Sequence, residues 1–145
     1  MNKNFEITGT TKLTCLLGDP VSHSISPAMH NASFQKLGLD YAYLAFDVDE
    51  EHFERAVDGL ITLGASGWNC TMPLKRRMYE RVDTLSDSAL LSGAVNTVVN
   101  RDGQLFGDNT DGYGFLQSMR DAGFSCKGAH AVMLGSGGAA AAILA

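Results

Sequence analysis

Three side chains that could do chemistry lie close together in the sequence: the amide of Asn69, the hydroxyl of Thr71 and the ammonium of Lys75. They follow an apolar run and surround Pro73, which has a fixed φ, lacks an N–H and is expected at the first position of a helix. Lys75 then falls in the first helical turn, where the helix dipole disfavours a cation. Local rules are often broken at functional sites. The trio is therefore a candidate site for a polyol or carbonyl compound, and a solvated surface lysine is the alternative.

Four more polar residues are expected near these three. Ser24 and Ser26 follow a first apolar run, Asn96 lies inside a later one, and Asp111 ends the loop 107–111. Because ligands bind beyond the carboxyl ends of strands in open α/β sheets, all seven side chains should meet at one sheet edge. Hydroxyls, amides, one cation and one carboxylate suit a small molecule that carries hydroxyl groups and a carboxylate. Taken singly, Ser26 could cap a helix and Asn96 could satisfy a turn.

The elements that position these residues alternate between strand and helix patterns. Strands are expected at residues 13–17, 41–48, 67–70, 94–99, 104–106 and 131–134. The last of these would lack its sheet within this chain, so residues 131–134 should be disordered, docked elsewhere or paired with another copy of the chain. Helices are expected from a Ser26 cap to Gly38, from an Asp49 cap to Gly64, after Pro73, and at residues 86–92 and 112–122. Asp102-Gly103 marks a hairpin. This order predicts an α/β fold with an open, mostly parallel but mixed sheet flanked by helices.

Composition narrows the classes of function. The chain has 145 residues, 45% of them hydrophobic, and a net charge of -5. Its longest basic run is residues 75–77, so nucleic acid is not an expected partner. Three scattered cysteines without a C-x-x-C pair indicate free thiols and predict a cytoplasmic protein. Neither a signal peptide nor a membrane span is expected, because no apolar stretch has the required length.

Two kinds of catalytic site are also not expected. The four histidines show no ligand spacing, so the sequence predicts no metal site. No serine lies in a G-x-S-x-G elbow, so hydrolase chemistry lacks its signature.

Five segments, in order, resemble the successive signatures of the shikimate dehydrogenase family. They are residues 23–27 (HSISP), 69–75 (NCTMPLK), 93–97 (GAVNT), 107–112 (GDNTDG) and 135–139 (GSGGA). The resemblance implies reversible NADP-dependent reduction of 3-dehydroshikimate to shikimate, a step of chorismate and aromatic amino-acid biosynthesis. The family usually has an aliphatic residue where this chain has Cys70, whose side chain should face the core.

The resemblance also implies a role for each candidate residue. The substrate carboxylate would be held by Ser24 and Ser26. The ring hydroxyls would be bound by Asn69, Thr71, Asn96 and Asp111. The catalytic pair would be Lys75 and Asp111. Hydride addition to a ketone builds negative charge on oxygen, and Lys75 can supply the cation or proton that this charge needs.

The glycine-rich segment near the end is expected to bind the cofactor. Gly135, Gly137 and Ala140 fit the pattern G-x-G-x-x-A. The NADP phosphates would lie against the turn Gly135-Ser136-Gly137-Gly138-Ala139. We therefore expect a substrate-binding domain at residues 1–112, followed at residues 113–145 by a linking helix and the truncated start of a Rossmann domain. The chain as given is expected to be inactive.

Three other functions fit the same residues. A quinate or quinate/shikimate dehydrogenase would share the scaffold. A non-catalytic module could bind a shikimate-like metabolite as a sensor. A purely structural domain would bind no cyclohexene carboxylate at all. A homodimer is compatible with each reading.

Overall fold

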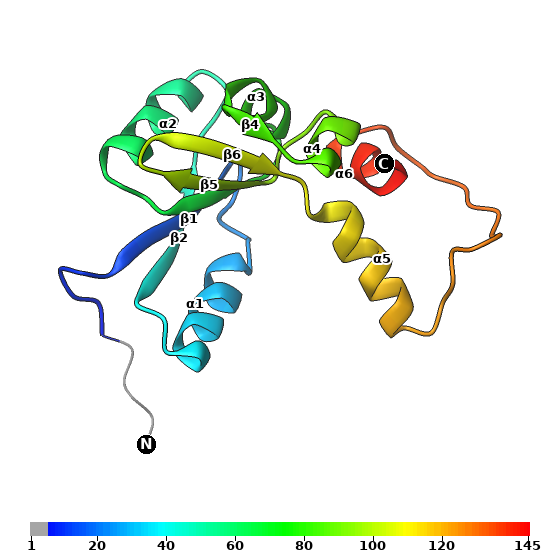
Figure 1. Cartoon of the computed structure of the whole chain (residues 1–145), viewed down its shortest axis with the longest axis horizontal. Coiled ribbons are helices and arrows are strands. Elements are labelled where there is room, and N and C mark those ends of the chain that lie inside the picture. The colour runs from blue at the N-terminus through cyan, green and yellow to red at the C-terminus, as the bar shows by residue number, and fades with distance from the viewer. Residues whose placement is uncertain (1–5) are drawn as a thin grey trace.

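The computed structural model describes residues 6–145 and shows a six-stranded sheet with helices on both faces (Figure 1). Residues 1–5, at the start of the predicted substrate-binding domain, lie outside the described part. The strands are β1 (Lys12–Gly18), β2 (Tyr41–Asp47), β3 (Gly67–Cys70), β4 (Thr84–Leu85), β5 (Thr97–Arg101) and β6 (Gln104–Asp108). The helices are α1 (Ser26–Leu37), α2 (Phe53–Thr62), α3 (Lys75–Arg81), α4 (Asp87–Ser92), α5 (Asp111–Asp121) and α6 (Gly138–Leu144).

The sheet is mixed, as predicted, with the strand order β2-β1-β3-β5-β6-β4. Strand β1 pairs in parallel with β2 and β3, whereas β5 runs antiparallel to both of its neighbours. The β5–β6 turn has positive φ at Asp102 (53°) and Gly103 (90°), as a two-residue type I′ hairpin requires. This direction of β5 brings its start to the edge where β1, β3 and β6 end. Thr97 is consequently paired with both Asn69 and Asp108.

Each face of the sheet has its own core. On the face covered by α2 and α3, Phe53 and Met78 are fully buried against strand residues that include Cys15 and Cys70 (Figure 1). On the opposite face, next to α1, Leu16 packs with Tyr43. Side chains alternate between faces along a strand, which explains why neighbours in β1 enter different cores. The expectation that Cys70 faces the core is confirmed.

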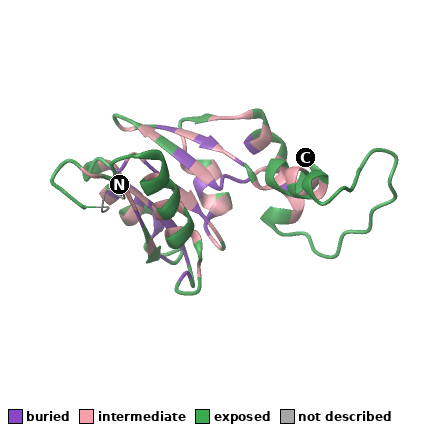
Figure 2. Cartoon of the chain, turned by 90° about the horizontal axis from the view of Figure 1, so that it is seen from below, coloured by how far each residue is buried: buried purple, intermediate pink, exposed green. Residues whose placement is uncertain are grey.

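The C-terminal part of the chain is far less buried. Helix α5 leads away from the sheet, residues 122–137 run as an exposed loop, and α6 returns to pack on α4 and α5 (Figures 1 and 2). Gly112 permits this return, because a Cβ atom at that position would overlap the carbonyl oxygen of Ala142. No helix among residues 6–145 is long and apolar enough to cross a membrane.

The strand pattern at residues 131–134 forms no strand, and Val132 and Leu134 are 90% and 95% exposed. This agrees with the expectation that the segment lacks its sheet within this chain. A strand needs a hydrogen-bonding neighbour, and none of the six described strands lies beside this segment. The expectation that Ser26 caps α1 is wrong, since Ile25 occupies the N-cap position and Ser26 is the first helical residue.

Three boundaries also differ from the expected ones. Pro73 precedes α3 in a turn that closes when the N–H of Leu74 donates to the Thr71 carbonyl (2.8 Å), so it is not the first helical residue. Asp49 accepts from the N–H of His52 (2.9 Å), which forms a turn before α2 and does not cap it. Strand β5 begins at residue 97, so Asn96 lies just outside it.

Candidate active site

Lys75 and Asp111 form an ion pair at the sheet edge. The Lys75 Nζ atom lies 2.6 Å from Asp111 Oδ2, and the two side chains are 20% and 27% exposed. Lys75 is the first residue of α3 and Asp111 the first residue of α5, so two helix starts converge here. The dipole of α3 disfavours the ammonium and that of α5 favours the carboxylate. The predicted placement of Lys75 in the first turn of a helix is confirmed. The carboxylate of Asp111 offsets the unfavourable charge at this position.

Asn96 fixes the other oxygen of the carboxylate. This residue is only 9% exposed, and its Nδ2 donates to Asp111 Oδ1 (2.7 Å) and to Thr110 Oγ1 (3.1 Å). Its Oδ1 accepts from the Thr97 hydroxyl (2.8 Å) and from the Thr110 N–H (3.1 Å). Both oxygens of Asp111 are thus held, and the carboxylate has a defined orientation toward Lys75.

Asn69 is joined to the same network from the centre of the sheet. Its Nδ2 donates to the backbone carbonyl oxygen of Asn96 (3.0 Å) and to Thr97 Oγ1 (3.1 Å). Its Oδ1 accepts from the hydroxyl of Tyr43 (2.8 Å). Four of the seven predicted residues, Asn69, Lys75, Asn96 and Asp111, consequently lie in one hydrogen-bonded group.

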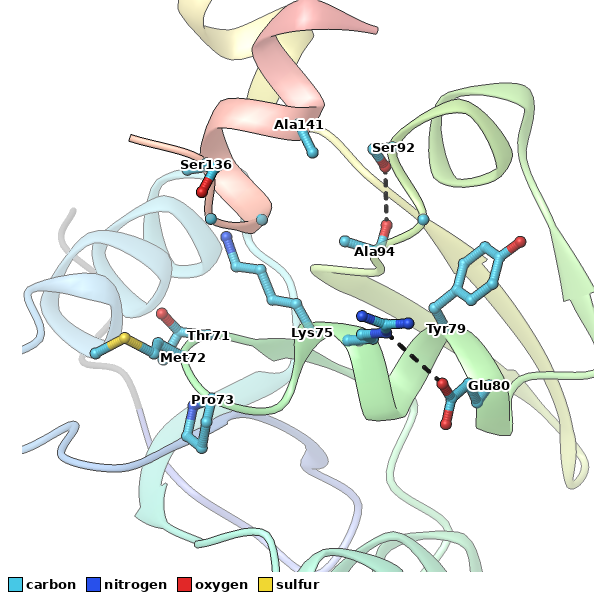
Figure 3. Close-up of a pocket in the computed structure, with 15 residues that line it drawn as sticks. Thr71, Met72, Pro73, Lys75, Tyr79, Glu80, Ser92, Ala94, Ser136 and Ala141 are labelled. Carbon is cyan, nitrogen blue, oxygen red and sulfur yellow. Dashed lines mark hydrogen bonds and ion pairs between the residues drawn. The ribbon is translucent and has the colours of Figure 1, made fainter. Parts of the chain in front are cut away.

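Thr71 lies beside this group and not within its hydrogen bonds. Its N–H donates to the Leu17 carbonyl (2.9 Å), which extends the β1–β3 pairing by one residue. Gly18 permits this approach, because a Cβ atom there would overlap the Thr71 methyl group. The Thr71 side chain is half-buried and lines the same cleft as Lys75 (Figure 3).

Ser24 lies on the loop between β1 and α1, and Ser26 is the first residue of α1. Ser24 Oγ accepts from the N–H of Ser26 (3.2 Å), and the Ser24 N–H donates to the Val21 carbonyl (2.9 Å). Both serines are half-buried. Within residues 6–145, neither shares a hydrogen bond with Asn69, Lys75, Asn96 or Asp111.

A cleft of about 720 Å³ separates α3 from the glycine turn. Lys75 points across it toward the start of α6, where Ser136 lies (Figure 3). A Cβ atom on Gly138 would sit 3.7 Å from the Lys75 side chain. Gly135 has φ of +121°, a conformation that L side chains rarely adopt. Gly137 and Gly138 present bare backbone to the cleft, which fits close approach of a phosphate group.

Asp108 and Asn109, which precede Asp111 in the chain, support the site. Asn109 is 3% exposed, and its Nδ2 donates to the Ala94 carbonyl (2.9 Å). Asp108 accepts from the hydroxyls of Ser86 (2.5 Å) and Ser88 (2.6 Å). Burial opposes ionisation of Asp108, but these hydrogen bonds outweigh it and lower the pKa of the carboxyl. Both residues anchor the loop that carries Asp111.

Sequence reasoning missed Tyr43 and Thr97. Tyr43 is 2% exposed, and its hydroxyl is bonded to Asn69. The signal that could have found Tyr43 was its hydroxyl, because a buried tyrosine hydroxyl needs a hydrogen-bond partner. No group of three or more histidine, cysteine, aspartate or glutamate side chains comes together as a metal site within residues 6–145.

Residues 16–98 match the family model described as the shikimate dehydrogenase substrate binding domain. The chain belongs to this family. The resemblance found in the five sequence segments is thereby confirmed. Shikimate dehydrogenases (NADP(+)) from Rubrobacter xylanophilus and Alkaliphilus metalliredigens are 54% and 49% identical to the chain, over 94% and 96% of its length. These matches cover 49% of each relative, so the chain spans about half the length of the curated relatives it matches.

Solved structures of shikimate dehydrogenases have the same architecture. Shikimate 5-dehydrogenase from Listeria monocytogenes, in complex with shikimate and NAD, superposes with a TM-score of 0.89 at 47% identity. That match covers 95% of this chain and 48% of the Listeria chain. The Thermus thermophilus enzyme, in complex with NADP(H) and shikimate, gives 0.85 at 40% identity over 91% and 50% of the two chains. The predicted fold class is confirmed.

Proposed function

We propose that this chain is the substrate-binding half of an NADP-dependent shikimate dehydrogenase, which reversibly reduces 3-dehydroshikimate to shikimate in aromatic amino-acid biosynthesis. Family membership supports the proposal, as do the relatives that carry this name. The observation that carries it is the Lys75–Asp111 pair, 2.6 Å apart and fixed by Asn96 beside a cleft. We further propose residues 1–112 as the substrate-binding domain and residues 113–145 as the linker and start of the cofactor domain.

The pair would act on the oxygen of the reacting carbonyl group. NADPH, when bound, would supply the hydride. As negative charge builds on the substrate oxygen, the Lys75 ammonium would neutralise it, and the proton shared by the Lys75–Asp111 pair would pass to that oxygen from either residue. Asn96 keeps the carboxylate aimed at Lys75 through its 2.7 Å hydrogen bond to Oδ1. General acid–base help of this kind accelerates reactions roughly 10²- to 10⁴-fold.

The remaining residues would bind the two ligands. In this proposal Ser24 and Ser26 hold the substrate carboxylate, while Asn69, Thr71, Asn96 and Asp111 bind ring hydroxyls. The NADP phosphates would be held by Gly135, Ser136, Gly137, Gly138 and Ala139. A dinucleotide site takes two βαβαβ halves, and residues 6–145 include only its glycine turn and one short helix. We therefore predict that the chain alone binds NADP poorly and transfers no hydride.

Titration of the chain with shikimate tests the proposal. We expect saturable binding by calorimetry or NMR at up to about millimolar concentration, weaker than in a complete enzyme. Loss of a hydroxyl that pairs a buried ligand group costs roughly 1 to 3 kcal/mol, so Ser24→Ala should weaken binding about 5- to 150-fold. Exposed Ser22 offers the matched control, Ser22→Ala. The absence of any response to shikimate would contradict the proposal, and tighter binding of quinate would shift it to a quinate dehydrogenase.

Two properties of the whole protein stay predictions. Sedimentation or light scattering would test the homodimer. Fractionation of cells would test the cytoplasmic location.

A further inference from the structure

Tyr43 links two parts of the site that are distant in the sequence. Its backbone is bonded to α1, because Asn31 Nδ2 donates to the Tyr43 carbonyl (2.9 Å) and the Tyr43 N–H donates to Asn31 Oδ1 (2.8 Å). The imidazole of His30, also on α1, stacks on the Tyr43 ring with centroids 4.2 Å apart and planes 11° apart. The Tyr43 ring is thus held against α1, the helix that begins at Ser26.

The hydroxyl of Tyr43 begins a chain of hydrogen bonds that all run in one direction. Tyr43 donates to Asn69 Oδ1 (2.8 Å), and Asn69 Nδ2 donates to Thr97 Oγ1 (3.1 Å). The Thr97 hydroxyl donates to Asn96 Oδ1 (2.8 Å), and Asn96 Nδ2 donates to Asp111 Oδ1 (2.7 Å). Each donor therefore points along the chain toward the carboxylate.

Chemistry fixes this direction at both ends. The carboxylate of Asp111 can only accept hydrogen bonds. The backbone carbonyl oxygen of Asn96, which accepts from Asn69 Nδ2 (3.0 Å), can only accept as well. If the amide of Asn69 were flipped, its oxygen would face that carbonyl oxygen. The phenol meets the amide as a donor, and burial raises the pKa of Tyr43, so it keeps its proton throughout the neutral range. Hydrogen bonds in such a chain polarise and strengthen one another.

We infer that Tyr43 is a positioning residue of the site, which acts through Asn69 and Thr97 to orient Asn96 and the carboxylate of Asp111. The inference rests on the proposed function for its ligand, shikimate, but not for its geometry. The hydroxyl of Tyr43 is hydrogen-bonded to Asn69 Oδ1, and within residues 6–145 it shares no hydrogen bond with Lys75 or the glycine turn. Its effect on ligand binding should therefore pass entirely through Asn69.

A double-mutant cycle tests this inference. Tyr43→Phe keeps the stacked ring and removes only the hydroxyl. Tyr41→Phe is the matched control, since Tyr41 lies two residues away in β2 and its hydroxyl is outside this chain of bonds. We expect Tyr43→Phe to raise the Kd for shikimate about 5-fold or more, because it removes the first donor of the hydrogen-bond network. Tyr41→Phe should change the Kd less than about 2-fold. Because residues in one network are coupled, their effects should not add. In an Asn69→Ala background, Tyr43→Phe should have no further effect.

A spectroscopic measurement keeps the inference separate from the proposed function. In the ligand-free chain, Tyr43→Phe should shift the side-chain amide NMR signals of Asn69 and Asn96, and Tyr41→Phe should leave them in place. If the wild-type chain binds no shikimate, the proposed function fails and these signals alone decide the inference. Unchanged Asn96 signals would overturn it. Equal effects of Tyr43→Phe in the wild-type and Asn69→Ala backgrounds would overturn it too, because they would indicate a purely structural role.

Discussion

Residues 12–111 and residues 112–145 hold their parts of the proposed site by different means. In the first region the side chains sit on strand ends and helix starts above two packed cores, and hydrogen bonds join four of them. In the second region only Ala142 is buried, and the glycine turn is held mainly by the packing of α6 on α4 and α5. The proposed catalytic pair is thus held by packed cores, while the proposed cofactor turn depends on a single short helix.

Hydrogen exchange should show the largest contrast between the two regions. Amides in the centre of β1 and β3 are bonded within the sheet, so their exchange requires opening of the core. Domains of this size have unfolding free energies of about 5 kcal/mol or more, which correspond to slowing of about 10³-fold or more. Amides of residues 130–134, which donate no backbone hydrogen bond in the structure, should exchange at nearly intrinsic rates. Equal protection of both regions by mass spectrometry would remove the distinction.

Truncation of one core side chain should destabilise the chain far more than truncation of an exposed one. Phe53 is fully buried, and Phe53→Ala should lower the free energy of unfolding by about 3 to 5 kcal/mol. Leu134 is 95% exposed, and Leu134→Ala should change it by less than about 0.5 kcal/mol. Urea unfolding followed by Trp68 fluorescence measures both. A large loss with Leu134→Ala would show that residues 131–134 are packed in solution.

A chimaera separates the functions of the two regions. We would join residues 1–145 to the remaining half of the Listeria relative and measure shikimate oxidation. Lys75→Ala should lower kcat about 10²-fold or more, because it removes the positive charge that neutralises the reacting oxygen. The control Lys36→Ala, at the exposed end of α1, should leave kcat unchanged.

The glycine turn should respond differently in the same chimaera. Gly135→Ala should raise KM for NADP several-fold, because φ of +121° strains any residue with a Cβ atom. Its effect on the shikimate KM should be small.

If Lys75→Ala kept kcat within about 2-fold of the wild type, Lys75 would be only a surface cation.

Thiol labelling should give the smallest contrast. Cys126 is exposed, whereas Cys15 and Cys70 are buried. Burial raises the pKa of Cys15 to about 12, so its thiolate is scarce and it should stay unlabelled between about pH 7 and 9. The native chain should therefore react at one thiol and the unfolded chain at three, a difference of about 3-fold. Fast labelling of Cys15 in the native chain would indicate an open core.

Features set by neighbouring residues could be predicted from the sequence. The hairpin at Asp102-Gly103 and the helix that begins after Ser86 and ends at Gly93 both formed as expected. Their geometry depends on backbone preferences and caps within a few residues. Residues 131–134 have equally good strand composition, but a strand also requires a neighbour, and none of the six described strands lies beside this segment.

The site was predictable in its members and not in its connections. Asn69, Asn96 and Asp111 could be placed together because polar residues after strands meet at one edge of a sheet. The partners Tyr43 and Thr97 depend on the register of β2, β1, β3 and β5, which pairs residues far apart in the sequence. A hydrogen-bond chain across four strands is therefore a tertiary property. The ligand roles of these residues stay predictions.

The position of Asp111 at the first residue of α5 has a mechanical consequence. The exposed loop at residues 122–137 follows a helix of 11 residues, about 16 Å long, before α6 returns to α4. If that helix swung by about 10° with Asp111 as the fulcrum, its far end would travel about 3 Å, whereas the carboxylate would stay in place. The lever arm is thus long for the loop beyond α5 and nearly zero for the ion pair. A small swing of α5 about Asp111 would therefore displace that loop and leave the Lys75–Asp111 pair in place.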